Sequence, residues 1–515
     1  RYQSASELLL ALDSPDKKVA VRSRRPRYLR FRAYAVLALL LLIITAASFV
    51  YLRPVRVQTL AVLPIAYEGT NADTEYLGEG LTESLINKLS GISTFEVKPL
   101  TMVSIYKNQK VDPLQIGRDS KVDLVFLGAI TQEQDSMILQ TRLIRTKDGS
   151  QVFRQEYRLE PSSILELLDN LSGQITSKVQ LTLSGDERKL LATRQTINAD
   201  AYRMYVRGRH FWRKRDKENI QTAISFFEQA IDLDPAYAQA YSGLADCYLI
   251  LSTVAYGPLP TKEAMSKARF AAETALEIDD TLCEAHTSLG VYQFRHEWNW
   301  AEAEREFKQA IRLNPNYSTA YYWYSNLLAL MGRSSESIAA SEKTKELDPF
   351  SPLSDMNLAR AYHYARRYDV AADLFRKMLD KNPNDLRTLY MLGYVYERQG
   401  LYQESISSLQ KVYEKDKLFA AAPLGYVYAR AGRRAEALRI LNEIEDKSKY
   451  PLVPPQEKAI IYLGLDDKDR AFMLLQEACR DRFATLPLLL IEPFLDGIRS
   501  DLRFNELARC VNLAQ

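Results

Sequence analysis

Residues 371–400 read AADLFRKMLDKNPNDLRTLYMLGYVYERQG, and the outline of this stretch recurs elsewhere in the chain. It contains two apolar helical patterns separated by a short polar turn at Asn382 and Pro383. Pro315 and Pro349 precede Pro383 in steps of 34 residues. A fixed period near 34 is typical of stacked helical hairpins. The sequence therefore predicts a mainly helical repeat array.

Each period carries the same residue types at matching places. On the first helix a large apolar residue, a small residue and an aromatic follow in order, as in Leu389, Leu392, Gly393 and Tyr396. Small residues let two helix backbones approach closely, while an aromatic ring fills the groove beside them. The pattern resembles the tetratricopeptide repeat (TPR). This resemblance implies a superhelix whose concave face binds peptides or partner domains.

The same scheme extends in both directions from residues 371–400. About eight hairpins are expected over residues 198–482 as a TPR superhelix, followed by a helical carboxy-terminal cap over 483–515. An insertion from Val254 to Lys262 contains Gly257, Pro258 and Pro260. It is expected to lengthen the loop between two helices. The recurring aromatic and small residues are expected to pack between helices rather than to bind a ligand.

A groove for partners is expected on the opposite face of the first helices. Tyr and Arg are common at binding hot spots because each combines a large contact area with a directed polar group. The candidate groove residues are Tyr322, Asn326, Arg360, His363, Arg387, Tyr390, Tyr394 and Arg398. The alternative is that most of them are solvated superhelix surface.

The second strong pattern is residues 33–52, which contain no charged residue. At ~1.5 Å per residue this run would cover about 30 Å, the thickness of a bilayer's hydrocarbon core. A basic juxtamembrane linker over 15–32 holds eight Lys and Arg residues, against Arg53 and Arg56 just after the run. Basic residues stay on the cytoplasmic side. The sequence therefore predicts one transmembrane helix in an inner membrane, with a cytoplasmic amino terminus and an extracytoplasmic, periplasmic body after residue 56.

Residues 1–14 begin with RYQSA, followed by ELL at 7–9 and Leu12. This short stretch resembles the last helix of the kinase domain in bacterial receptor-type serine/threonine protein kinases, and an ordinary amphipathic helix is the alternative. The resemblance implies that the chain is the remainder of a longer kinase. The sequence has no Gly-rich phosphate loop, V-A-I-K, H-R-D or D-F-G motif. The chain itself is therefore expected not to be an enzyme.

Residues 57–185 alternate strand-type and helical patterns. Strands are expected at 59–64, 95–99, 121–131, 137–144 and 151–159, and helices at 76–89 and 164–181. This order, with AVLP at 61–64 and EYLGEGLTE at 75–83, resembles the TolB amino-terminal-like α/β domain. The resemblance implies a non-catalytic interaction or sensing module. Gly78 and Gly80 suggest a nucleotide loop, but Glu83 stands where a third glycine would be and acidic neighbours would repel phosphate.

Composition limits the remaining chemistry. The 515 residues include 68 Lys and Arg against 65 Asp and Glu, for a net charge of +3, and much of the surplus lies in the basic linker. No nucleic-acid partner is expected. Four cysteines, Cys247, Cys283, Cys479 and Cys510, form no C-x-x-C pair and are expected to be small buried hydrophobes. No metal site and no cofactor are expected.

Together these patterns predict a membrane-anchored, non-catalytic scaffold or sensor that binds protein or peptide partners on the TPR concave face and reports to a bacterial serine/threonine kinase. One alternative is the sensor half of a transmembrane winged-helix transcriptional regulator or a nucleotide cyclase. Another is a small enzyme domain over 486–515. The sequence leaves the partner and the oligomeric state open.

Overall fold

The computed structural model describes residues 58–513, with gaps at 69–71, 93–94, 108, 110, 134–135, 161–162, 182, 193–195, 197, 215, 253–260, 447, 451–452 and 484. Three predicted segments lie outside the described residues: the kinase-like tail (1–14), the basic linker (15–32) and the transmembrane helix (33–52). Most of the predicted insertion, residues 254–260, also lies outside them.

The length and apolar character of the described helices test the predicted membrane localisation. Within this part of the chain, no helix is both long enough and apolar enough to cross a bilayer. The two longest, α3 (Ala72–Ser90) and α11 (Thr261–Ile278), each carry at least five charged residues. A charged side chain is costly in the hydrocarbon core. This finding contradicts the predicted single-pass membrane protein with a cytoplasmic amino terminus and a periplasmic body, and we correct that prediction.

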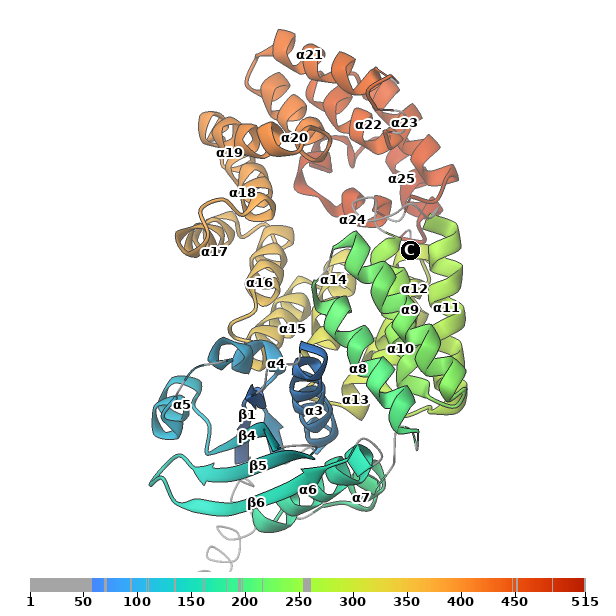
Figure 1. Ribbon diagram of the computed structural model, residues 1–515. Helices are drawn as coiled ribbons and strands as arrows, with labels where there is room; N and C mark the ends of the chain where they lie inside the picture. The colour runs from blue at the N-terminus through green and yellow to red at the C-terminus, as the bar shows by residue number, and fades with distance from the viewer. Residues whose placement is uncertain are drawn as a thin grey trace, which may run out of the picture. The chain divides into compact units, whose positions relative to one another are not determined.

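A six-stranded sheet occupies the amino-terminal part of the described chain (Figure 1). Its strands are β1 (Gln58–Val62), β2 (Ala66–Glu68), β3 (Phe95–Val97), β4 (Leu124–Glu133), β5 (Ser136–Arg145) and β6 (Gln151–Leu159). β1 runs parallel to β3 and β4, and β4, β5 and β6 form an antiparallel meander. The five predicted strands are confirmed. The sequence analysis missed β2, which follows Pro64 and also pairs with β4.

Helices cover the sheet because their apolar stripes match its buried side chains. They are α3, α4 (Leu100–Val103), α5 (Pro113–Ser120) and α6 (Ile164–Lys178). Two more elements, η1 (Ser104–Tyr106) and α7 (Gly185–Ala192), contact these helices. On α3 the predicted stripe of Leu77, Leu81, Leu85 and Leu89 is buried. Residues spaced by four share one face of a helix, so the stripe can pack as a unit. α3 contacts β1, β2, β3 and α6.

Eight helical hairpins follow the sheet in the described part of the chain. They are α8 (Ala199–Lys214) with α9 (Lys217–Leu233), α10 (Ala238–Leu251) with α11, α12 (Cys283–Tyr292) with α13 (Trp300–Leu313), α14 (Ser318–Leu330) with α15 (Ser334–Leu347), α16 (Pro352–Tyr364) with α17 (Tyr368–Lys381), α18 (Leu386–Arg398) with α19 (Tyr402–Lys415), α20 (Lys417–Arg430) with α21 (Arg434–Glu445), and α22 (Pro455–Gly464) with α23 (Lys468–Arg480). A π-helical turn, η3 (Gln293–Glu297), ends α12.

The recurring glycine and phenylalanine fit together between neighbouring helices. Phe227 on α9 is fully buried between Gly208 on α8 and Gly243 on α10. A Cβ atom at Gly243 would lie 2.6 Å from the Phe227 ring, well inside van der Waals contact. Phe307 on α13 packs against Gly290 on α12 in the same way two hairpins later. The small residue is therefore required because a ring occupies the space that its side chain would need.

The sheet region contacts the first hairpin through α3 and α8, which lie side by side (Figure 1). Gly80 on α3 faces Val206 on α8, and a Cβ atom at Gly80 would lie 2.1 Å from a Val206 methyl group. Beside this contact the hydroxyls of Ser84 and Tyr202 are 2.9 Å apart. Gly80 therefore serves close helix packing, which accounts for the glycine that suggested a nucleotide loop.

Charged side chains surround the contact between α3 and α8. Glu83 accepts hydrogen bonds from Arg209, at 3.0 and 3.1 Å, and from Arg213. Burial alone would raise the pKa of the Glu83 carboxyl, but Arg213 and Arg209 hold it below its ordinary value. The hydrogen bond with His210 lowers the pKa of Glu79 to about 2, with help from Lys107. Both carboxylates are thus charged near neutral pH and paired across the two parts of the fold.

The carboxy-terminal residues form α24 (Leu486–Ile491), the 3-10 helix η4 (Pro493–Ile498) and α25 (Leu502–Cys510). A disulfide joins Cys479 on α23 to Cys510 on α25. The expectation that all four cysteines are free buried hydrophobes is therefore wrong for this pair, although Cys247 and Cys283 are free and buried. Spacing along the chain gave no sign of the pair, because its two members meet only when α25 packs on α23.

Replacing a buried ring should test the packing of the hairpins. We expect Phe307→Ala to lower the free energy of unfolding by about 3 to 5 kcal/mol, because it leaves a cavity against Gly290. The matched control is Phe270→Ala, at a ring that is 69% exposed, with an expected change within about 0.5 kcal/mol. Urea unfolding followed by circular dichroism measures both, and equal midpoints would contradict the assignment.

The contact at Gly80 gives a second test. Gly80→Ala should destabilise the protein by about 1 to 3 kcal/mol, since the added methyl group overlaps Val206. The control is Gly173→Ala in α6, where nothing lies within 4 Å of an added Cβ atom. There alanine should stabilise by about 0.5 to 1 kcal/mol, through helix propensity. Thermal unfolding of both variants would show shifts of opposite sign, and a stabilised Gly80→Ala would refute the close approach.

Candidate functional site

Aromatic and basic side chains line one face of the first helices of hairpins four to seven. We call this set the first-helix face, and its members are Tyr322, Arg360, His363, Tyr364, Tyr390, Tyr394, Arg398 and Tyr426. The helices α14, α16, α18 and α20, which carry these residues, follow one another along the array (Figure 1). The period of the repeat thus places similar residue types in a row.

The chain's own carboxy-terminal segment lies against this face. We call Glu492, Pro493 and Phe494 the EPF segment. Glu492 receives a hydrogen bond on each oxygen, from His363 Nε2 at 2.9 Å and from the Tyr364 hydroxyl at 3.0 Å. The site that the sequence analysis treated as an open groove is therefore in contact with residues near the end of the chain.

The next two residues of the segment make contacts of other kinds. Arg398 Nη1 donates a hydrogen bond to the carbonyl oxygen of Pro493, at 3.0 Å. The Phe494 ring stacks on Tyr394, with centroids 5.2 Å apart and planes at 17°, and is tilted against Tyr426 at 5.5 Å. Such ring pairs stabilise a contact by more than the burial of their surface alone would. A carboxylate, a backbone carbonyl and a ring are thus each matched by a different partner.

Local sequence explains why the segment presents itself this way. The residue before a proline favours an extended backbone, and Glu492 has φ −61° and ψ 136°. Pro493 then occupies the first position of η4, where its missing N–H costs nothing. Leu490, Phe494 and Leu495 are buried around the turn. Glu492 is consequently held at a bend with its side chain directed to α16.

Burial keeps Tyr364, Tyr390, Tyr394 and Tyr426 in their neutral form. It raises the pKa of Tyr426 to about 12, and it raises the pKa values of Tyr364 and Tyr390 further above their ordinary value. Arg360 Nη2 donates to the Tyr364 hydroxyl at 3.1 Å, so that hydroxyl can donate its own proton to Glu492. Neutral phenols of this kind bind a carboxylate and perform no proton transfer near neutral pH.

The eight predicted groove residues do not share one environment. Arg360, His363, Tyr394 and Arg398 lie around the EPF segment, and Tyr390 adjoins them through a hydroxyl contact with Tyr394 at 3.2 Å. Tyr322 is half-buried and packs edge to face on Trp323, and Arg387 is exposed. Asn326 is buried, with its amide 3.4 Å from Asn357 Oδ1. Asn326 and the fully buried His363 are therefore not solvated surface.

Sequence reasoning missed several residues of this site. Tyr364 and Tyr426 lie on the same helices as the predicted candidates, yet only a structure shows which side they face. The EPF segment itself was overlooked. Its one signal is a glutamate followed by proline within the apolar run LPLLLIEPFLDGI at 486–498, where a charge needs a partner.

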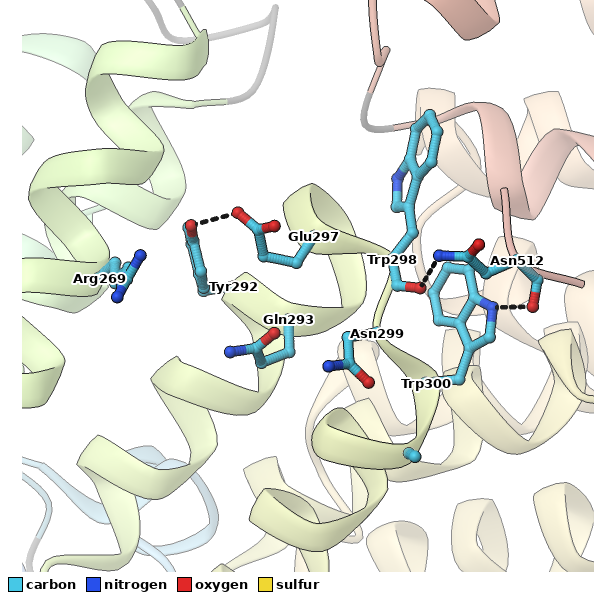
Figure 2. A pocket seen from close by; sticks show the side chains of 9 residues that line it. Arg269, Tyr292, Gln293, Glu297, Trp298, Asn299, Trp300 and Asn512 are labelled. Atoms are coloured by element: carbon cyan, nitrogen blue, oxygen red, sulfur yellow. Dashed lines mark hydrogen bonds between the residues drawn. The ribbon is translucent and has the colours of Figure 1, made fainter. Parts of the chain in front are cut away.

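A cavity of about 590 Å³ lies at the junction of η3 and α13 (Figure 2). Its lining residues are Arg269, Tyr292, Gln293, Glu297, Trp298, Asn299, Trp300, Ala301 and Asn512. The Tyr292 hydroxyl donates to Glu297 at 2.5 Å. Trp300 Nε1 donates to the Asn512 carbonyl oxygen at 2.8 Å, and Asn512 Nδ2 donates to the Trp298 carbonyl oxygen at 3.2 Å. These contacts fix the end of the chain to the third hairpin.

The lining of the cavity includes one carboxylate, Glu297, which accepts the hydrogen bond from the Tyr292 hydroxyl. The described lining includes no serine, cysteine or histidine that could act as nucleophile or base. Across the described ranges, no group of three His, Cys, Asp or Glu residues could hold a metal ion. We therefore take the first-helix face as the candidate functional site.

Comparison with known families supports the repeat assignment. Models of the tetratricopeptide repeat match residues 214–237, 306–339 and 356–423. The described fold is mainly helical, TPR solenoid-like, with a small amino-terminal sheet region. Residues 56–176 match a model of the second domain of HilA/YgeH-like transcriptional regulators.

Individual relatives are distant. Transcriptional regulator HilA of Salmonella typhimurium (strain LT2) is 23% identical over 329 residues, which cover 64% of this chain and 57% of HilA. The "Putative adenylate cyclase 3" of Rhizobium meliloti (strain 1021) is 23% identical over 233 residues, or 45% of this chain and 40% of that protein. A tetratricopeptide repeat protein from Parabacteroides merdae covers 52% of the chain and 99% of its own, with 13% identity and a TM-score of 0.39. The chain thus spans little more than half the length of HilA.

The pH dependence of stability tests the burial of Glu457. The charge of this carboxylate helps to raise the pKa values of Tyr390 and Tyr394. Burial raises the pKa of Glu457 from 4.5 to about 7. A carboxyl that binds its proton more tightly in the folded state makes stability fall as pH rises from 4.5 to 7. We expect the free energy of unfolding of Glu457→Gln to fall by about 2 kcal/mol less than that of the parent between pH 4.5 and pH 7. Urea unfolding at several pH values measures the slope, and the exposed Glu404→Gln should leave it unchanged.

Proposed function

We propose that this chain is the non-catalytic, partner-binding region of a signalling protein, in which the first-helix face binds protein or peptide partners. TPR repeats are protein interaction scaffolds, and that general role holds for this chain. The observation that carries the proposal is the EPF segment itself. The face already holds a short piece of the chain, at the start of η4, through a carboxylate, a carbonyl and a ring.

The sheet region supports a regulatory rather than a catalytic role. It joins the repeats through α3 and α8, and its acidic side chains Glu79 and Glu83 are paired with cations of α8. We propose that it acts as an interaction or sensing module, as the resemblance to TolB amino-terminal-like domains implies. A module fixed to the repeats in this way can pass a change in its own contacts directly to the first hairpin.

Two classes of signalling protein are proposed as the setting. The first is the serine/threonine kinase expected from residues 1–14. The second is a transcriptional regulator or a nucleotide cyclase, and the match of residues 56–176 to the second domain of HilA/YgeH-like regulators favours it. The regulator is the better supported of the two, because its match covers the sheet region and the alignment with HilA continues over 329 residues.

Site-specific cross-linking tests the use of the first-helix face. A photoreactive phenylalanine in place of Tyr322 should capture a discrete partner in cells, because Tyr322 belongs to this face. The control places the same group at Met473 on α23, which is 57% exposed. We expect at least fivefold more cross-linked partner at Tyr322, measured by mass spectrometry. Equal capture at both positions would refute partner binding on the first-helix face.

A further inference from the structure

The EPF segment is bound to the first-helix face as a ligand would be. It lies beyond the last repeat helix, α23, and its hydrogen bonds to the face join residues 95 to 129 positions apart. We infer that the face is a recognition site for peptides that present a carboxylate, a proline and an aromatic ring in succession, and that Glu492, Pro493 and Phe494 are its intramolecular occupant, which such a peptide displaces. This inference rests on the proposed function and names the chemistry of the partner.

The first subsite selects a carboxylate over its amide. Both oxygens of Glu492 face donors, His363 Nε2 and the Tyr364 hydroxyl. Within the described residues, Nδ1 of the fully buried His363 has no hydrogen-bond partner, so a neutral ring carries its proton on Nε2 and donates it to Glu492. A glutamine at this position would turn an NH₂ group toward one of the two donors. The geometry therefore favours the acid.

The second subsite binds the backbone carbonyl oxygen of the proline, and the third binds an aromatic ring. Proline keeps the preceding residue extended, which reduces the entropy lost when the peptide is ordered. Arg398 donates a hydrogen bond to the Pro493 carbonyl oxygen. The proline ring contributes to this subsite by fixing the direction of the chain. Tyr394 and Tyr426 form a slot for Phe494, which is 6% exposed when seated. An aliphatic side chain would lose the stacking on Tyr394.

The flanks of the segment are held independently of the face. The disulfide between Cys479 and Cys510 and the hydrogen bonds of Asn512 with the third hairpin secure both ends. Arg366 also holds both flanks, through hydrogen bonds to the Ile491 carbonyl oxygen at 3.3 Å and to Asp496 at 2.8 Å. A peptide that displaces the EPF segment would leave it tethered by these flanks. The tether also gives the segment a high effective concentration, so it competes strongly with a free peptide.

Fluorescence polarisation with the full chain tests the inference. The probe is a labelled peptide of residues 488–498, LLLIEPFLDGI. We expect Phe494→Ala in the chain to increase affinity for this probe at least tenfold over the parent, because the slot is vacated. The control Leu502→Ala, at a residue 82% exposed, should bind as weakly as the parent. No gain with Phe494→Ala, in a chain whose circular dichroism matches the parent, would overturn the inference.

The identity of the peptide provides the second arm. Changing glutamate to glutamine in the probe, or phenylalanine to leucine, should each weaken binding to the Phe494→Ala chain about tenfold. Binding that ignores both changes would overturn the assigned chemistry. If Phe494→Ala does not fold, hydrogen exchange of the parent chain replaces it: excess peptide should speed exchange at residues 491–496, and unchanged exchange would refute displacement.

The two proposals fail in different ways. If the photoreactive group at Tyr322 captures a partner but the peptide does not bind the Phe494→Ala chain, the scaffold role stands and the recognition of the three-residue pattern is refuted. If the peptide binds with the expected preference and Tyr322 captures nothing, the recognition site stands and the use of this face in cells is refuted.

Discussion

The close packing of Phe227 between Gly208 and Gly243 is the contact on which the repeat array depends. A single hairpin has too little apolar surface to bury, so each hairpin is stable only when its neighbours cover it. The missing side chain at glycine sets how near two helices come, and that distance sets the direction of the first helices. Glycine also brings neighbouring helices close on α18 and α20, where Gly393 faces Leu409 and Gly425 faces Ile461, and these two helices carry the Tyr394 and Tyr426 that meet Phe494.

The same device joins the sheet region to the repeats. Gly80 allows α3 to rest on Val206 of α8, and paired charges then surround the contact. Additional hydrogen bonds reach further along the array, from Asn316 to the carbonyl oxygens of Ser90 and Phe95 and from Thr101 to Asp348. The sheet region is thus attached to the array at more than one hairpin, as a part of the same compact unit.

Local periodicity predicted the helices and strands well. The 34-residue step and the alternation in β5 and β6 are both patterns of residues that lie near one another along the chain. The regular part of the site, Arg360 to Arg398, followed from the same step. The EPF segment could not be predicted from this step, because Glu492 and His363 are 129 residues apart along the chain and meet only in the folded structure. The pairing of Cys479 with Cys510 and the strand β2 escaped for the same reason. The apolar run at 33–52 led to a wrong prediction of localisation. Its hydropathy was the basis of that prediction, and no described helix is long and apolar enough to cross a bilayer.

The hydrogen bonds that tie Asn512 to Trp298 and Trp300 change how the array should come apart. A linear stack frays from whichever end is free, and its terminal hairpin opens first. Here the last residues are fastened to the third hairpin, and Arg482 adds two bonds to the carbonyl oxygens of His296 and Glu297. Hairpins three to eight therefore form a closed circuit of contacts, which has no loose end from which unzipping can begin.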